Sequence, residues 1–469
     1  MTNIKEKVLF NVVLGHTENL ICEFNFSKGV LYMGKLGDTI KHKSFINIIW
    51  LSADSLIRMG LGFLVSVWLA RYLGPENFGT YNYCLAIITI YVSVASLGMN
   101  GVVVREIIKN EMSTSIVMGT SVVLQILGSL FASIFVIATV SILRPNEWGV
   151  FLAALVMIPS VLFRSSDIFK YWFESKVNSK FTVFSQNIAF FISSATKILI
   201  IYLDGSYIYI CATVSLEAFI VSILLLFFYK KHGYENKWKY NFIEAKRLLS
   251  LSWPLILSGV AFMLYMRIDQ IMIGNMIGDA AVGIYSVAVK MVEVWYFFPV
   301  AIVSSLFPKI IKLREVDINE YNKRLQFLYD LLVVLSVSIA VAVTFLSDYI
   351  IGFFYTQQYM EASNLIKIYS WVSVFYFLSS ASGRWYINEG LQKYALNRNI
   401  IGLIMAIVLN YFLIPIYGAL GSVYATLVAY ACAGYFFDVL SSRTRTAFYQ
   451  KTKALWVPGS FIRLVKSFR

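Results

Sequence analysis

Continuous apolar runs, each long enough to cross a lipid bilayer, constrain this chain more than any other feature of its sequence. About 20 apolar residues in a helix span the hydrocarbon core of a membrane, and we expect about twelve such helices. The alternating segments of about 10 residues that a membrane β-barrel requires do not occur. The expected spans are residues 44–70, 79–99, 115–142, 148–168, 183–203, 206–229, 248–276, 281–307, 326–352, 364–383, 397–416 and 418–440.

The scarcity of charge excludes a soluble protein. Charged residues make up 14% of the chain and apolar residues 58%, whereas about 25% of a soluble domain is charged. The fold class we expect is therefore an all-α polytopic membrane protein.

The positive charge is distributed unevenly between the loops. A net charge of +14 would suggest a nucleic-acid partner in a soluble chain. Here most Lys and Arg residues lie in alternate loops, which the positive-inside rule places in the cytoplasm. Under that assignment Arg71 and Arg144 are the two basic residues in outer loops. We therefore expect both termini in the cytoplasm and no nucleic-acid partner.

A long basic connector divides the chain into two halves. Six expected spans precede it and six follow it, and Met33 begins a short basic stretch that we interpret as the natural start. The expected regions are an N-terminal cytoplasmic extension (1–43), a six-helix bundle (44–229), a cytoplasmic linker (230–247), a second six-helix bundle (248–440) and a basic cytoplasmic tail (441–469).

One short turn sequence occurs twice, half a chain apart. ARYLGPENFGTYNY (70–83) joins the first two expected spans, and GNMIGDAAVGIYSV (274–287) joins the seventh and eighth. We interpret the turn as an internal repeat; the alternative is that short hairpins simply look alike. The matching positions are Gly74 with Gly278, Gly79 with Gly283 and Tyr81 with Tyr285.

The repeated glycines have a mechanical explanation. Gly74 and Gly278 stand where a helix ends in a left-handed residue. Gly79 and Gly283 would let the next helix start close against a neighbour. Because six spans is an even number, the halves enter the membrane from the same side and form parallel repeats. Such an arrangement encloses a central cavity that alternates its access between the two faces.

The segment LARYLGPENFGTYNY resembles the hairpin of the polysaccharide transporters. These are the O-antigen and repeat-unit flippases of the multidrug/oligosaccharidyl-lipid/polysaccharide exporter superfamily. The resemblance covers residues 44–440 through span number, orientation, the two-half layout and this turn. The second copy departs from the pattern, because it reads Ile277-Gly278-Asp279 where the first reads Leu-Gly-Pro.

The resemblance implies a function. It implies flipping of a polyprenyl-diphosphate-linked oligosaccharide repeat unit for surface polysaccharide biosynthesis, either O-antigen lipopolysaccharide or capsule. The implied partners are an undecaprenyl-diphosphate-linked oligosaccharide, membrane lipid, H⁺ or Na⁺, and polysaccharide assembly proteins. The implied location is the bacterial cytoplasmic (inner) membrane.

Ionisable side chains inside the expected spans are the candidate functional residues. Each costs about 2.5–3.5 kcal/mol to insert, so each usually faces a cavity or a partner. Cations in a cavity would attract an anionic diphosphate. For substrate binding we expect Arg58, Lys197, Arg267 and Lys290. As ion-coupling or cavity acids we expect Asp54, Glu217, Asp269 and Glu293.

Simpler roles stay open for several of these residues. Asp54 with Arg58, and Lys290 with Glu293, have the spacing of ion pairs closed within one helix. We expect Lys367, near an outer span end, to extend to the membrane interface. Seven aromatic residues could stack on sugar rings or pack between helices: Tyr265, Trp295, Tyr296, Trp371, Tyr376, Trp385 and Tyr386.

Other function classes find less support in the sequence. We expect no enzymatic activity, cofactor or metal site, since the four cysteines form no CxxC pair and the ATP-binding pattern GxxxxGK[ST] does not occur. Two alternatives stay open. A drug exporter of the same superfamily would favour an acidic cavity, and a membrane repeat-unit polymerase would need a larger outer loop than any expected here.

Overall fold

The computed structural model describes residues 24–25, 30–31, 35–109, 114–232 and 238–468, with side chains described from residue 58 to residue 467. The expected start at Met33 and the side chain of Asp54 lie outside this description. A short antiparallel pair, β1 (Phe24–Asn25) and β2 (Val30–Leu31), precedes the helices.

Helices make up almost all of the described chain. In the first half they are α1 (Lys35–Ala95), α2 (Asn100–Lys109), α3 (Thr114–Leu143), α4 (Trp148–Met157), α5 (Pro159–Phe163), the 3-10 helix η2 (Arg164–Ser166), α6 (Asp167–Ser175), α7 (Lys180–Tyr202) and α8 (Tyr207–His232).

In the second half they are α9 (Phe242–Met276), α10 (Asp279–Glu293), η3 (Val294–Tyr296), α11 (Phe297–Leu313), α12 (Ile318–Phe354), η4 (Gln357–Tyr359), α13 (Glu361–Tyr369), α14 (Val372–Asn388), α15 (Gln392–Tyr417), α16 (Ala419–Gly434), η5 (Phe436–Leu440), α17 (Arg445–Leu455) and α18 (Val457–Phe468).

The all-helical membrane fold is confirmed. Within the described residues, 10 helical stretches are long and apolar enough to cross a membrane. The first, Arg58–Lys109, contains parts of two expected spans. The expected span 364–383 is divided between α13 and α14, so neither helix alone has the length that a span requires.

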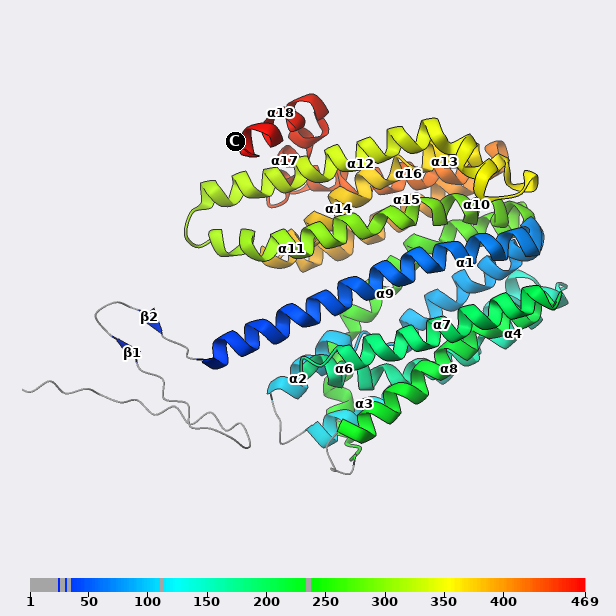
Figure 1. The fold of residues 1–469 in the computed structure, drawn as a ribbon, viewed down its shortest axis with the longest axis horizontal. Helices are drawn as coiled ribbons and strands as arrows, with labels where there is room; N and C mark the ends of the chain where they lie inside the picture. The colour runs from blue at the N-terminus through cyan, green and yellow to red at the C-terminus, as the bar shows by residue number, and fades with distance from the viewer. Residues whose placement is uncertain (1–23, 26–29, 32–34, 110–113, 233–237, 469) are drawn as a thin grey trace, which may run out of the picture.

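A reversal at Gly74 explains the length of α1. A continuous helix of 61 residues would be about 90 Å long, three times the thickness of the hydrocarbon core. Gly74 instead adopts φ 68°, and the chain turns back there (Figure 1). Gly278, its counterpart in the second copy, has φ 126°. The prediction that both glycines occupy positive-φ positions is confirmed.

The two copies of the repeated turn pack against each other. A Cβ atom on Gly79 would overlap the backbone carbonyl of Asp279, and a Cβ atom on Gly283 would overlap that of Pro75. The contact is reciprocal, because Pro75 and Asp279 occupy matching positions in the two copies. The repeat therefore marks the place where the two halves meet, which is more than a general likeness between hairpins.

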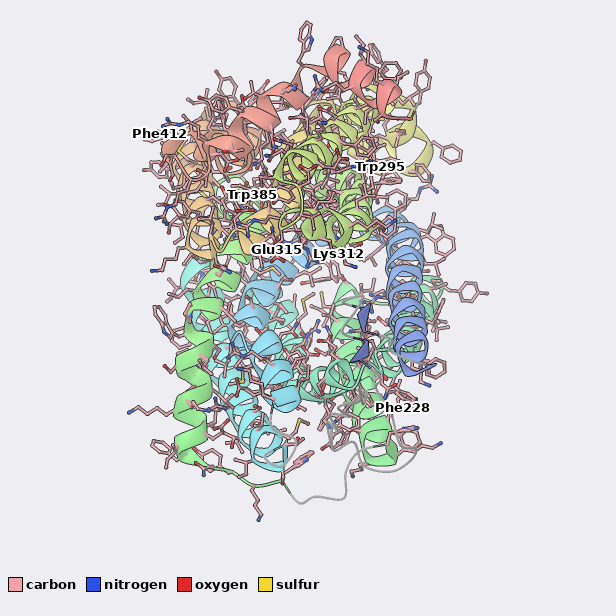
Figure 2. The ribbon with its side chains drawn as sticks, turned by 90° about the vertical axis from the view of Figure 1, so that its left-hand side faces the viewer. Phe228, Trp295, Lys312, Glu315, Trp385 and Phe412 are labelled. Atoms are coloured by element: carbon pink, nitrogen blue, oxygen red, sulfur yellow. The ribbon has the colours of Figure 1, made fainter. Side chains whose placement is uncertain are left out.

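The helices form two groups that follow the two halves of the sequence. In Figure 1 the helices from α2 to α8 lie in the lower group and those from α10 to α18 in the upper group. The long helix α1 lies at the boundary, where it contacts both α9 and α10. Figure 2 shows the same two groups from one end, with Trp385 and Lys312 of the second group near the boundary.

The two ends of the molecule differ in character. α2, α6, α11 and α18 lie at the left-hand end in Figure 1, which we call the basic end. The opposite end carries the reversals at Gly74 and Gly278, and we call it the turn end. Basic residues near the basic end include Lys230, Lys231, Lys309, Lys312, Lys323 and Arg324.

Candidate functional site

A cavity of about 320 Å³ lies among helices of the first half. Three of the predicted residues line it: Arg58 from α1, Lys197 from α7 and Glu217 from α8. Tyr81, from the repeated turn, also lines it. The sequence therefore identified charged residues that lie together in space although they are far apart in the chain.

A broken helix supplies the remaining charged residues of the cavity. α4 ends two residues before Pro159, which lacks a backbone donor, and η2 then tightens the chain. This path brings Arg164 and Asp167 to the cavity wall, where they pair at 3.6 Å. The wall thus holds three bases and two acids, an excess of positive charge. Neither residue was predicted as a site residue, because both lie at the last few positions of the expected span 148–168, next to an inner loop.

Lys290 reaches from the second half toward this cavity. Its Nζ donates a hydrogen bond of 3.1 Å to Ser66 Oγ on α1. The same ammonium lies 4.9 Å from the ring centroid of Phe78 and 5.9 Å from that of Tyr81, within cation–π range. Because Tyr81 lines the cavity, Lys290 adds positive charge beside it.

Glu293, the residue with the spacing of a helix-internal partner for Lys290, forms its described ion pair with another base. Glu293 pairs with Arg267 across α9 and α10, at 3.3 Å. Both side chains of that pair are about one-quarter exposed. Arg267 is therefore held by an acid within the second half, and it is not among the residues that line the cavity.

Asp269 lies deeper in the second half. It is buried, and it accepts hydrogen bonds from the Tyr285 hydroxyl and, at 2.8 Å, from the backbone N–H of Gln270. The Tyr285 hydroxyl is also 3.4 Å from the Thr426 hydroxyl on α16. Tyr81 and Tyr285 occupy matching positions in the two copies of the turn. Tyr81 lines the cavity of the first half, whereas Tyr285 donates a hydrogen bond to the buried carboxylate of Asp269 in the second half.

Two further predictions concern Lys367 and the aromatic residues of the second half. Lys367 pairs with Asp348 at 3.0 Å. Among the aromatic residues, Tyr296 stacks on Tyr376 with centroids 3.7 Å apart, and Tyr265 packs on Tyr430 at 4.6 Å. These four rings lie against one another inside the second half, as packing between helices requires.

Arg144, expected in an outer loop, is buried at the turn end. Its guanidinium contacts Asp279 at 2.9 Å, Glu147 at 2.5 Å and the side-chain oxygen of Asn275 at 3.1 Å, and it also donates to the carbonyl of Gly274. Asp279, Asn275 and Gly274 belong to the second half. Arg144 therefore ties the end of α3 to the second copy of the repeated turn.

We expect Arg144→Ala to open the turn end. Hydrogen bonds to charged groups contribute about 1.5–3 kcal/mol each, so losing even one raises the open population by about tenfold or more. Cys84 is fully buried near this contact, and its modification by a membrane-impermeant thiol reagent measures the opening. The other cysteines, Cys22, Cys211 and Cys432, are first replaced by serine.

Arg71→Ala is the matched control for this prediction. Arg71 lies at the same end, but it is exposed, and it makes a single hydrogen bond of 3.4 Å, to the Phe353 carbonyl. Its replacement should leave the labelling rate of Cys84 within about twofold of the parent rate. Equal labelling in both variants would show that Arg144 does not hold this end closed.

Two family models match the chain. The model described as "Polysaccharide biosynthesis protein" matches residues 45–314. The model named MatE matches residues 254–412.

Several curated proteins are similar over most of their length. The capsular polysaccharide biosynthesis protein CapF of Staphylococcus aureus is 22% identical over 77% of this chain and 89% of its own. The putative O-antigen transporter of Shigella flexneri is 23% identical over 76% of this chain and 87% of its own. The probable low-salt glycan biosynthesis flippase Agl15 of Haloferax volcanii is 20% identical over 79% of this chain and 78% of its own.

Two solved structures share the fold. An inward closed conformation of the lipid II flippase MurJ superposes with a TM-score of 0.66 at 16% identity, covering 90% of this chain and 93% of its own. An inward-facing multidrug resistance MATE family transporter of the MOP superfamily superposes with a TM-score of 0.63 at 11% identity, covering 88% of this chain and 99% of its own.

Proposed function

The chain belongs to the polysaccharide biosynthesis protein family, and on that premise we propose that it flips a lipid-linked oligosaccharide across a membrane. Relatives named as an O-antigen transporter and a glycan biosynthesis flippase support this substrate class. The observation that carries the proposal is the basic cavity of the first half with Lys290 beside it.

The charges of the cavity suit a diphosphate-linked sugar. Arg58 and Lys197 would donate charge-assisted hydrogen bonds to diphosphate oxygens, which lowers the cost of bringing that anion into the membrane. Lys290 would add a third cation from the opposite half. The lipid tail stays in the bilayer while the two halves rock, with the turn end closed in the present state.

The finer assignments are part of the same proposal. Residues 44–229 and 248–440 would be the two moving bundles, joined by 230–247, with both termini in the cytoplasm of a bacterial cell. The carrier lipid would be undecaprenyl diphosphate, and polysaccharide assembly proteins would receive the product. We assign no catalytic role to any residue of the chain.

Asp269 is the acid that we assign to ion coupling. It is buried between α9 and α10, and its partner Tyr285 also reaches Thr426 on α16, so movement among these helices would change the surroundings of its carboxylate. A proton or Na⁺ bound there would then favour one arrangement of the second half. Transport in proteoliposomes that persists unchanged after both gradients are collapsed would overturn this assignment.

Cells that lack the protein should accumulate the lipid-linked repeat unit on the leaflet where it is made. Chemical labelling of sugars on the two leaflets of inverted and right-side-out vesicles measures the distribution. The wild-type chain should restore the normal distribution, and the empty vector is the control. An unchanged distribution in the deletion strain would contradict the proposal.

The drug-exporter alternative makes a different prediction. The MatE model matches part of the second half, but cationic drugs favour an acidic cavity, and bases outnumber acids on the wall described here. Unaltered drug sensitivity in the deletion strain, together with loss of surface polysaccharide, separates the two functions.

A further inference from the structure

The basic tail expected at the C-terminus is a folded hairpin of two helices. α17 and α18 pack against α12 and lie at the basic end (Figure 1). Two ion pairs hold the hairpin to the second half, one from each helix: Lys451 with Asp438 at 2.6 Å, and Arg463 with Asp330 at 2.7 Å.

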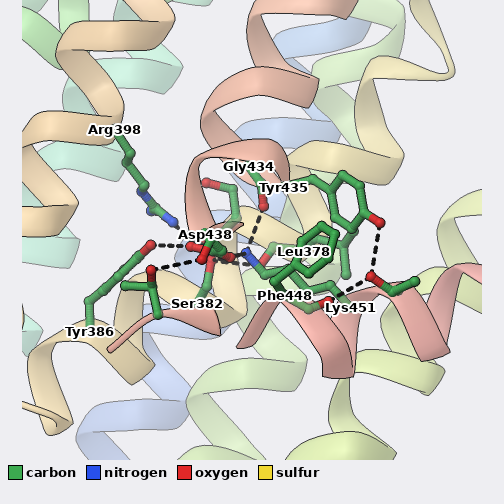
Figure 3. A network of polar contacts seen from close by, with 12 residues as sticks. Leu378, Ser382, Tyr386, Arg398, Gly434, Tyr435, Asp438, Phe448 and Lys451 are labelled. Atoms are coloured by element: carbon green, nitrogen blue, oxygen red, sulfur yellow. Dashed lines mark hydrogen bonds and ion pairs between the residues drawn. The ribbon is translucent and has the colours of Figure 1, made fainter. Parts of the chain in front are cut away.

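The first ion pair is completely buried. Figure 3 shows Lys451 donating to the Gly434 carbonyl at 2.6 Å and to Ser382 at 3.0 Å, while Tyr386 donates to Asp438. A buried pair of this kind is tolerated only when further hydrogen bonds satisfy both partners, as they do here. α17 is therefore fixed to α14, α16 and η5.

The second ion pair fixes α18 in the same way. The Arg463 guanidinium contacts both oxygens of Asp330 at 2.7 Å, in a fork that matches the carboxylate. Asp330, on α12, also accepts from Gln326 at 2.8 Å and from Ser460 at 3.1 Å. Asp330 and Asp438 lie near the ends of the expected spans 326–352 and 418–440, and both are buried anchors.

The anchored hairpin encloses a cavity of about 500 Å³ against α12. Besides the Asp330–Arg463 pair, its wall carries two lysines, Lys323 and Lys453, both exposed to solvent. Three bases thus face the cavity against one acid, and that acid is already occupied by Arg463. The neutral polar side chains of the wall are Asn322, Gln326, Tyr449, Gln450 and Ser467. Gln326 already donates to Asp330, and Ser467 donates to the Leu464 carbonyl.

Exposed apolar side chains surround the hairpin. Phe461, Ile462 and Val465 project from α18, and Trp456 stands at the connection between the helices; each of the four is more than 40% exposed. Large apolar and aromatic residues beside lysine and arginine are typical of helices that lie in a membrane interface. The cavity would then open at the level of the lipid headgroups.

We propose that this cavity binds the phosphate of an anionic membrane phospholipid, on the leaflet that faces the basic end. Lys323 and Lys453 pair with the phosphate, Asn322 and Tyr449 donate to its remaining oxygens and the headgroup, and the apolar residues of α18 contact the acyl chains. The anchors keep the two lysines at a fixed spacing on separate helices. This inference concerns a lipid of the bilayer and is independent of the transported substrate.

Binding is tested on the full chain in nanodiscs of phosphatidylcholine, either alone or with about a fifth phosphatidylglycerol. Native mass spectrometry counts the phosphatidylglycerol molecules that remain bound after release from the disc. We expect Lys323→Gln/Lys453→Gln to weaken phosphatidylglycerol retention at least tenfold, because each basic side chain near an anionic surface contributes about 1 kcal/mol, or about fivefold.

The matched control is Lys309→Gln/Lys312→Gln, which removes the same charge at the same end but from α11, outside the cavity. Retention should stay within about twofold of wild type. Equal losses in the two double variants, or no loss in either, would overturn the site. Competition by free glycerol phosphate as strong as that by the lipid would also overturn it, since the site would then take a soluble phosphate.

Thermal unfolding in detergent shows whether the variants are folded. Should the double variant unfold early, the single variant Lys453→Gln is measured in its place, since Lys453 is exposed and its loss leaves both anchors intact. Lipid retention is measured without any transport assay. The lipid site can therefore be refuted while the proposed flipping is upheld, and the flipping can be refuted while the lipid site is upheld.

Discussion

Lys290→Gln should reduce transport of the lipid-linked oligosaccharide by about tenfold to a hundredfold. Glutamine preserves a hydrogen-bond donor for Ser66 but removes the charge that faces Phe78 and Tyr81 at the cavity. A hydrogen bond to a charged group contributes about 1.5–3 kcal/mol, which corresponds to that range of rates. Complementation of a deletion strain, and flipping rates in proteoliposomes, measure the loss.

Lys367→Gln is the matched control for Lys290→Gln. Both lysines lie in expected spans, but Lys367 pairs with Asp348, a residue more than half exposed. Its loss should change the flipping rate by less than about twofold, because an exposed pair contributes little. The role of Lys290 would be refuted by full activity of Lys290→Gln, or by equal losses in both variants at equal protein levels.

Gly283→Ala should also abolish most transport, by preventing the two turns from meeting. The added Cβ would overlap the Pro75 carbonyl, which is backbone and has little freedom to move away. Overpacking of this kind costs about 1–3 kcal/mol, so the ratio of closed to open molecules falls by about fivefold to 150-fold. Thiol labelling of Cys84 should rise as the flipping rate falls.

Two further glycine variants sharpen this test, one expected to have the same effect and one expected to have none. Gly79→Ala should act in the same way, because its Cβ would overlap the Asp279 carbonyl. Gly352→Ala is the control: it lies in α12, and no heavy atom stands within 4 Å of an added Cβ. Normal transport and unchanged Cys84 labelling in Gly283→Ala would show that the turns can separate without functional consequence.

The sequence predicted the features that depend on local chemistry. Apolar runs located the helices, and the glycines at positions 74 and 278 predicted two positive-φ residues. Where a helix breaks was harder to foresee, because a break depends on packing as well as composition. The expected span 148–168, for example, is a single helix, whereas the structure divides it among α4, α5, η2 and the start of α6.

Contacts between distant segments limited the prediction of the site. Lys290 has Glu293 three positions away, yet its hydrogen-bond partner is Ser66 in the other half. Arg267 takes Glu293 instead. Spacing along one helix gives the available neighbours on that helix, but it carries no information on which other helix lies opposite. Arg58, Lys197 and Glu217 were predicted because burying any charge inside a span already requires a polar neighbour.

The reciprocal packing of Gly79 and Gly283 has a consequence for how the halves separate. Each glycine rests on peptide groups of the other copy, so at both positions main chain meets main chain. Because the two contacts join the same pair of turns, separation of the turns breaks both of them. Opening at this end would then be a single concerted event, in which Arg144 must also release Asp279.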